Sequence, residues 1–149
     1  MARYEASVVI NRPVEEVCAY LNDVRNWAEW RSDVLEAEQT SEAPLGVGTT
    51  FRLVMQWMGR RSEATLEVTE YEPNRKLKYW GASGPGSAEH TYTFEPVEGG
   101  TRLIFVAEAE IGGFVKRLYG LAEPIFMRMA KRHMDGSFAN LKDILEAQA

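Results

Sequence analysis

Two histidines and several tyrosines are the side chains of this sequence best suited to acid–base chemistry near neutral pH. His90 and Tyr92 lie two residues apart in the stretch AEHTYTFEP, so they share one face of an expected strand. Tyr79 lies in the preceding expected strand, LKYWG. An imidazole can act as a general acid or base, and tyrosine joins an apolar body to a polar hydroxyl. His90, Tyr92 and Tyr79 are therefore the candidate catalytic residues. The alternative for each is a hydrogen-bonded structural role inside the core.

Other kinds of catalytic or cofactor site find little support in the sequence. No cysteine or carboxylate stands at metal-ligand spacing from His90 or His133, so we expect no metal. The chain has no Gly-x-Ser-x-Gly elbow, and the stretch GASGPG lacks the strand–helix setting of a phosphate or dinucleotide site. We therefore predict no cofactor. Glu123, at the expected start of the C-terminal helix, is either a helix cap or a carboxylate at the mouth of a pocket.

Composition narrows the class of protein further. The 149 residues, 45% hydrophobic and 26% charged, predict one globular domain over 1–149. The net charge of −5 argues against nucleic-acid binding, which usually needs a basic face; we interpret the basic group near Lys131 as a solvated helix face. Cys18 is the only cysteine, so no internal disulfide is expected. Without a signal peptide or a membrane-spanning run, a cytoplasmic location is expected.

The hydrophobic periodicity that positions these residues predicts an α+β fold. A first strand is followed by two short helices, the first begun by Pro13, and then by about six strands joined by turns in an antiparallel meander. The expected strands cover 3–10, 34–40, 51–59, 63–71, 77–81, 88–96 and 102–111, and the stretch ASGPGS is expected to be a loop. A long helix over about 123–147 covers the apolar face of the sheet. The stretch FVKRLYGLA before it is either a short helix or a loop.

The order of motifs along nearly the whole chain resembles one known family. The stretches that carry the resemblance are VVINRPVEEVCAYLNDVRNWAEW, PLGVGTTF, VTEYEPNRKLKY, YTFEPVEGGTRLIF and FANLKDILE. They are similar to the polyketide cyclase/dehydrase and lipid-transport family, in the START and birch-pollen-allergen-like superfamily (SRPBCC). The resemblance implies a helix-grip fold, in which a curved antiparallel sheet of about seven strands wraps around the long C-terminal helix. It also implies a cavity between sheet and helix that binds hydrophobic or aromatic molecules.

Trp27 and Trp30 share a face of the second short helix. They either pack that helix against the end of the sheet or line the cavity mouth together with Glu123. Gly136 lies within the long helix, where glycine costs helix propensity. A close approach of its backbone to the sheet or to a ligand would explain it, and a tolerated glycine is the alternative.

The residues predicted to face inward differ from a core built only for packing. Such a core favours Leu, Ile and Val, whereas this set is rich in methionine, aromatic and polar-tipped side chains, as small-molecule sites are. The alternative is that they fill the interior themselves. The predicted cavity residues are Phe51, Leu53, Met55, Trp57, Leu66, Leu77, Tyr79, His90, Tyr92, Phe105, Met127, Ala130, Met134 and Phe138, with Ser137 in the same helix stripe.

Three functions remain open at this point. The first is the binding of a hydrophobic small molecule, lipid-like or aromatic, in the internal cavity. The second is a cofactor-independent cyclase, aromatase or dehydratase working through the candidate catalytic residues. The third is a protein-interaction domain, such as a co-chaperone or a ribosome- or quinone-linked partner. Exposed apolar residues off the helix stripe, Ile125 and Met129, would fit that function or a homodimer contact.

Overall fold

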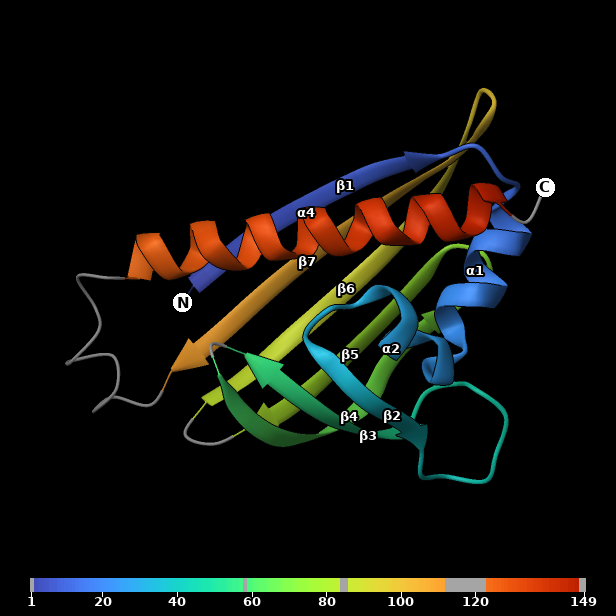
Figure 1. Ribbon diagram of the computed structural model, residues 1–149. Helices are drawn as coiled ribbons and strands as arrows, with labels where there is room; N and C mark the ends of the chain where they lie inside the picture. The colour runs from blue at the N-terminus through green and yellow to red at the C-terminus, as the bar shows by residue number, and fades with distance from the viewer. Residues whose placement is uncertain (1, 58, 84–85, 112–122, 148–149) are drawn as a thin grey trace.

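Seven antiparallel strands form one sheet in the order β1-β7-β6-β5-β4-β3-β2, so β1 and β2 lie at its edges. The computed structural model describes residues 2–57, 59–83, 86–111 and 123–147. The elements are β1 (Ala2–Ile10), α1 (Val14–Asn22), η1 (Val24–Asn26), α2 (Trp27–Trp30), β2 (Val34–Gln39), β3 (Thr50–Trp57), β4 (Arg60–Glu72), β5 (Lys76–Ser83), β6 (Gly86–Val97), β7 (Gly100–Ile111) and α4 (Glu123–Ala147). Figure 1 shows α4 lying across the sheet, with α1 and α2 near one end. The predicted helix-grip architecture is confirmed.

Local sequence explains how the chain enters and leaves the short helices. Pro13 precedes the first turn of α1, and Glu15 and Glu16 lie in that turn, where the helix dipole favours negative charge. Asp23 then caps η1 by accepting a hydrogen bond from the Arg25 backbone N–H at 3.1 Å. The predicted second helix therefore consists of a 3-10 turn followed by one turn of α-helix.

Two β-bulges interrupt the strand pairing. The register shifts between Val34 and Glu36 where β2 pairs with β3, and between Val68 and Glu70 where β4 pairs with β5. A bulge adds one residue to one strand, bends that strand and increases its twist. The first bulge lies directly after the connection that carries Arg31 and Asp33, and Leu35, between the two paired positions, is 42% exposed.

The hairpin between β5 and β6 differs from the sequence-based expectation. The stretch ASGPGS is expected to be a loop, but Ala82 pairs with Ser87 and Ser83 pairs with Gly86. The loop prediction is therefore wrong for these four residues. Small residues and glycines are weak strand formers by themselves, and here pairing with the neighbouring strands sustains the extended backbone.

The sheet has one apolar face and one charged face. Phe51, Leu53, Leu66, Leu77 and Phe105 are buried as their alternation predicts. On the opposite face, cross-strand ion pairs join Lys78 to Glu70 and Glu89, Arg52 to Glu38 and Glu63, and Arg102 to Glu95. The sheet therefore buries mainly the face that α4 and the short helices cover, and Val54 is a buried apolar residue on the charged face.

The C-terminal half of α4 is fixed to the end of β1 by polar contacts. Lys142 Nζ donates a hydrogen bond to the carbonyl oxygen of Val9 at 2.8 Å, and the backbone N–H of Asn11 donates to Glu146 at 3.1 Å. Leu141 and Leu145 on the same part of the helix are buried. The long helix is thereby held against the edge strand.

Substitution of Gly136 tests how much backbone entropy contributes to the stability of the folded chain. It lies in the middle of α4 on the exposed side, and a Cβ built there meets no atom within 4 Å. The prediction that the Gly136 backbone closely approaches the sheet is therefore wrong for the described residues. We expect Gly136→Ala to raise the free energy of unfolding by about 0.5–1 kcal/mol, because alanine loses less backbone entropy in a helix. Thermal and urea unfolding measure this change.

Gly99 is the matched control for this substitution. A Cβ at Gly99 also meets nothing within 4 Å, but its φ of +83° lies in the left-handed region that L-residues avoid. We expect Gly99→Ala to lower stability by about 1–2 kcal/mol. If Gly136→Ala destabilised the protein to a similar extent, the entropy argument for Gly136 would be wrong.

Candidate functional site

A layer of aromatic rings lies between α2, α4 and the sheet. Trp27 packs edge-on against Phe51 and Tyr79, with ring centroids 5.7 and 5.4 Å apart. Trp30 stacks on Phe138 of α4 at 5.9 Å, and Phe138 in turn meets Phe105 of β7. Both indoles are fully buried. Trp27 and Trp30 therefore pack in the interior, and their place at the mouth of a cavity stays a prediction.

A buried ion pair lies next to this aromatic layer. Arg31 and Asp33 occupy the connection between α2 and β2, where the helix ends at Trp30 and the chain turns into the sheet. Arg31 is 2% exposed, and its Nε and Nη2 donate to the two carboxylate oxygens of Asp33 at 3.3 and 3.1 Å. The guanidinium also lies over the ring of Trp27, 5.5 Å from its centroid. The pair is thus fixed by both carboxylate oxygens and an aromatic face.

Arg31 extends this network to the sheet. Its Nη1 donates to the hydroxyl of Tyr79 on β5 at 3.3 Å, and the same hydroxyl lies 3.0 Å from Nδ1 of His90 on β6. The adjacent Tyr92 is fully buried, and within the part of the chain that the structure describes its hydroxyl has no hydrogen-bond partner. Two of the three candidate catalytic residues are therefore joined directly by a hydrogen bond.

The surroundings set the charge of each group. Burial opposes the ionisation of Asp33, but the neighbouring Arg31 outweighs it and holds the pKa of this carboxyl below its usual value. Burial, and next the positive charge of Arg31, lower the pKa of His90 to about 3. Burial raises the pKa of Tyr79, and that of Tyr92 well above its usual value. At neutral pH the network therefore holds one charged pair and neutral His90, Tyr79 and Tyr92.

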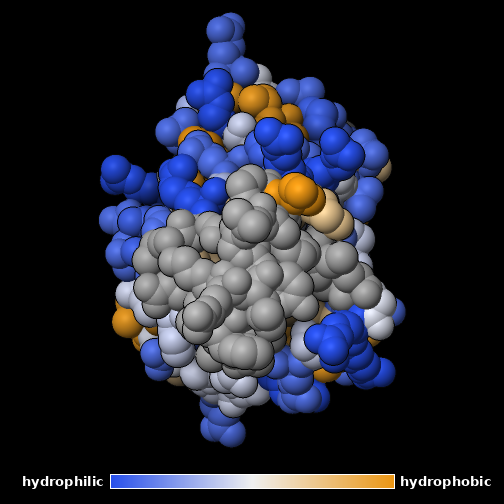
Figure 2. All heavy atoms as spheres, turned by 90° about the vertical axis from the view of Figure 1, so that its left-hand side faces the viewer, coloured by the Kyte–Doolittle hydropathy of each residue, from blue (hydrophilic) through white to orange (hydrophobic). Residues whose placement is uncertain are grey.

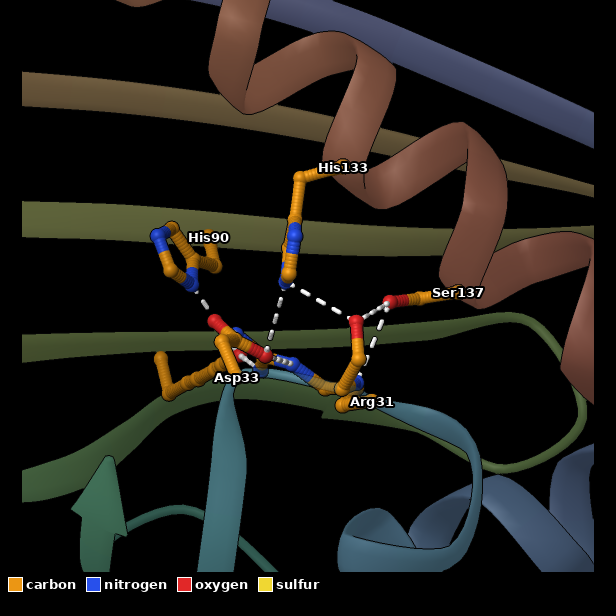
Figure 3. Close-up of polar contacts among 7 residues, drawn as sticks. Arg31, Asp33, His90, His133 and Ser137 are labelled. Atoms are coloured by element: carbon orange, nitrogen blue, oxygen red, sulfur yellow. Dashed lines mark hydrogen bonds and ion pairs between the residues drawn. The ribbon is translucent and has the colours of Figure 1, made fainter. Parts of the chain in front are cut away.

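The long helix adds a second group of polar side chains. His133 and Ser137 of α4 point toward the Arg31–Asp33 connection in Figure 3. Nε2 of His133 lies 3.2 Å from the Ser32 hydroxyl and 3.8 Å from Oδ1 of Asp33. Both contacts use the same ring nitrogen, so the imidazole cannot pass a proton from serine to aspartate through its two nitrogens as a catalytic triad requires. This group positions α4 over the connection.

The predicted cavity residues that the structure describes fall into two classes of burial. Met55, His90, Met127 and Ala130 are half-buried, whereas Phe51, Leu53, Leu66, Leu77, Tyr79, Tyr92, Phe105, Met134, Ser137 and Phe138 are buried. The side chains of Trp57 and Glu123 lie outside the described residues, as does the stretch FVKRLYGLA. That these residues line a cavity stays a prediction.

Arg31 and Asp33 are the site residues that the sequence analysis missed. They occur in the stretch WRSDV, directly after the second tryptophan. A charge pair two residues apart between a helix and a strand is ordinarily read as a solvated turn. The signal that could have identified it is position, because the connection lies between two elements whose apolar residues are predicted to face the interior.

Outside this network, the described residues offer little that suggests another site. No group of three or more His, Cys, Asp or Glu side chains in them could hold a metal ion. None of the described helices is long and apolar enough to span a membrane. Ile125 and Met129 are exposed, as expected from their positions off the helix stripe. Figure 2 faces the end where α4 begins, and the hydrophobic side chains described there form small groups among hydrophilic ones.

The fold and the polar cluster define the chain as a helix-grip domain with a buried ion pair beneath its long helix. The family model described as "Polyketide cyclase / dehydrase and lipid transport" matches residues 1–146. The chain belongs to this family, and the resemblance drawn from the sequence is confirmed.

Individual proteins agree with this assignment. An uncharacterized protein of Mycobacterium tuberculosis is 26% identical over 148 residues, which cover 97% of this chain and 99% of the relative. The crystal structure of TTHA0849 from Thermus thermophilus has a TM-score of 0.82 at 20% identity, covering 99% of both chains. The Zhui aromatase/cyclase from Streptomyces sp. R1128 has a TM-score of 0.78 at 16% identity, covering 97% of this chain and 93% of that one. Identities of 16% and 20% show that these two proteins share the fold of this chain, and nothing about its activity.

Proposed function

We propose that this protein binds a hydrophobic small molecule between the sheet and α4, in the cytoplasm, with the polar part of the molecule near Arg31, Tyr79 and His90. The observation that carries the proposal is the buried Arg31–Asp33 pair within an aromatic interior. A buried ion pair is often no more stable than apolar residues of similar volume. A core serving only stability gains little from it, whereas a binding site uses a few fixed polar groups to orient an apolar ligand.

Titration with apolar probes tests the proposal, together with native mass spectrometry of protein purified from cells. We expect naphthalene-sized aromatic probes to bind and to raise the melting temperature, since a ligand that binds only the folded state stabilises it. Ala130 is half-buried on the predicted inward stripe of α4, so Ala130→Trp should fill the space and weaken binding by at least about tenfold.

Trp80→Ala is the control for non-specific adsorption. Trp80 is 46% exposed on β5, and in the strand alternation it falls on the opposite face from Tyr79. Its removal should leave probe affinity unchanged. Absence of binding by every probe, or equal affinity in the wild type and a folded Ala130→Trp variant, would contradict the proposal.

A second candidate function is a cofactor-independent cyclase, aromatase or dehydratase at the same place. The observation that favours it is the hydrogen bond between Tyr79 and His90, with Arg31 behind it. The low pKa of His90 makes its imidazole a weak base at neutral pH. In such an enzyme, His90 would donate a hydrogen bond to the substrate, and Tyr79 and Arg31 would hold it in position.

A further inference from the structure

The hydrogen bonds of Tyr79 bear on which ring nitrogen of His90 carries the proton. A guanidinium has donors only, so the Tyr79 oxygen accepts the hydrogen bond from Nη1 of Arg31 at 3.3 Å. We take the single hydroxyl hydrogen of Tyr79 to be donated to Nδ1 of His90, which lies 3.0 Å away. In this arrangement Nδ1 is the acceptor, and a neutral imidazole with an acceptor at Nδ1 holds its hydrogen on Nε2.

The Nε2–H of His90 points away from the groups that fix it. In Figure 3 one ring nitrogen of His90 faces the dashed contact and the other is directed away from the Arg31–Asp33 cluster. Among the described residues, no hydrogen bond to Nε2 is found, although the rings of Tyr79 and Phe105 hold the imidazole in place at 5.2 and 5.1 Å. His90 as a whole is half-buried.

The charge balance around His90 disfavours a charged ligand. The charges acting on it belong to Arg31 and Asp33, which are paired to each other, while Tyr79 is neutral. A carboxylate brought into this setting would lose its hydration without gaining a free cation, and an ammonium group would meet a donor instead of an acceptor. An uncharged oxygen acceptor needs only one hydrogen bond.

We propose that His90 is the specificity-determining donor of the site, and that Nε2–H binds a carbonyl oxygen of an uncharged aromatic ketone, aldehyde or quinone. This inference rests on the proposed function and adds the chemical class of the ligand. Arg31 and Tyr79 are positioning residues, because they act on the ligand only through the tautomer of His90.

A pair of matched probes separates the two proposals. 2-Acetonaphthone and 2-ethylnaphthalene have nearly the same shape and differ in a carbonyl oxygen. We expect the ketone to bind about three- to tenfold more tightly, which is the worth of one hydrogen bond. If neither binds, the proposed function fails and the ligand class with it. If both bind equally, the proposed function stands and the ligand class is wrong.

His90→Phe is the corresponding variant, because phenylalanine keeps an aromatic ring between Tyr79 and Phe105 and removes the N–H. It should abolish the preference for the ketone and leave the affinity for 2-ethylnaphthalene unchanged. A preserved preference in the folded variant would overturn the role of His90. Trp80→Ala, on the opposite face of β5, should keep the wild-type preference.

Nitrogen NMR of the imidazoles tests the tautomer without a ligand. The chain has only two histidines, so the signals missing in His90→Phe identify His90. We expect the Nε2–H tautomer at pH 7 and no protonation of His90 between pH 8 and 5, because its pKa lies below this window. An Nδ1–H tautomer, or protonation of His90 within this range, would overturn the proposal.

Discussion

Asp33→Asn is expected to lower the free energy of unfolding by about 3–5 kcal/mol, the usual cost of removing one partner from a buried ion pair. The side chains have nearly the same shape, so the change removes the charge that compensates Arg31, which is 2% exposed. Burial would then oppose a cation whose remaining side-chain hydrogen bond, among the described residues, goes to the hydroxyl of Tyr79. Urea unfolding of a single domain of this size measures the difference.

The double variant Arg31→Met with Asp33→Leu is the control. It removes both charges, so no uncompensated ion stays inside, and we expect it to recover most of the stability lost in Asp33→Asn. It should also remove the tautomer control at His90. If Asp33→Asn cost less than about 1 kcal/mol, then the buried charge of Arg31 would not need compensation by Asp33. The buried ion pair would then give less support to the proposed function.

Trp27→Ala is the second change with a large expected effect, about 3–5 kcal/mol of lost stability. The indole is fully buried against Phe51, Tyr79 and Tyr92, and alanine would leave a void that the rigid sheet cannot close. Thermal unfolding followed by circular dichroism measures the loss.

Trp27→Phe and Trp30→Phe form a matched pair that separates volume from hydrogen bonding. Nε1 of Trp27 donates to the carbonyl oxygen of Leu21 at 2.6 Å, whereas Nε1 of Trp30 is buried without a partner among the described residues. Both variants lose similar volume, but only Trp27→Phe leaves a carbonyl unpaired. We expect it to cost about 0.5–1.5 kcal/mol more. Equal costs would mean that the bond to Leu21 contributes nothing measurable.

The strands and the long helix could be predicted because their residues repeat with simple periods. Alternation placed Leu66, Tyr79 and Tyr92 on the buried face, and the stripe ending at Leu145 gave the helix its bounds. The extension of β5 and β6 through the stretch ASGPGS could not be predicted in this way. It depends on which residues face each other across the hairpin, and the local sequence does not contain that information.

The ion pair could not be predicted for a different reason. The local sequence gives Arg31 and Asp33 the character of a solvated turn, and only packing buries them. Trp27 comes from α2 and Tyr79 from β5, and they surround the guanidinium once the sheet has closed against the helices. Long-range contacts therefore determine both the burial of these charges and the protonation of His90.

The position of β1 at the sheet edge, where it pairs with β7, constrains how this chain folds as it is synthesised. Ala2 faces Ala109 and Ile10 faces Thr101, so β1 leaves the ribosome about a hundred residues before its partner strand. The α4 contacts that fix the end of β1 come later still. Loop closure over such distances is slow, and an unpaired apolar strand is open to wrong partners in the meantime. The nascent chain completes its sheet only after β7, which ends at Ile111, has been translated.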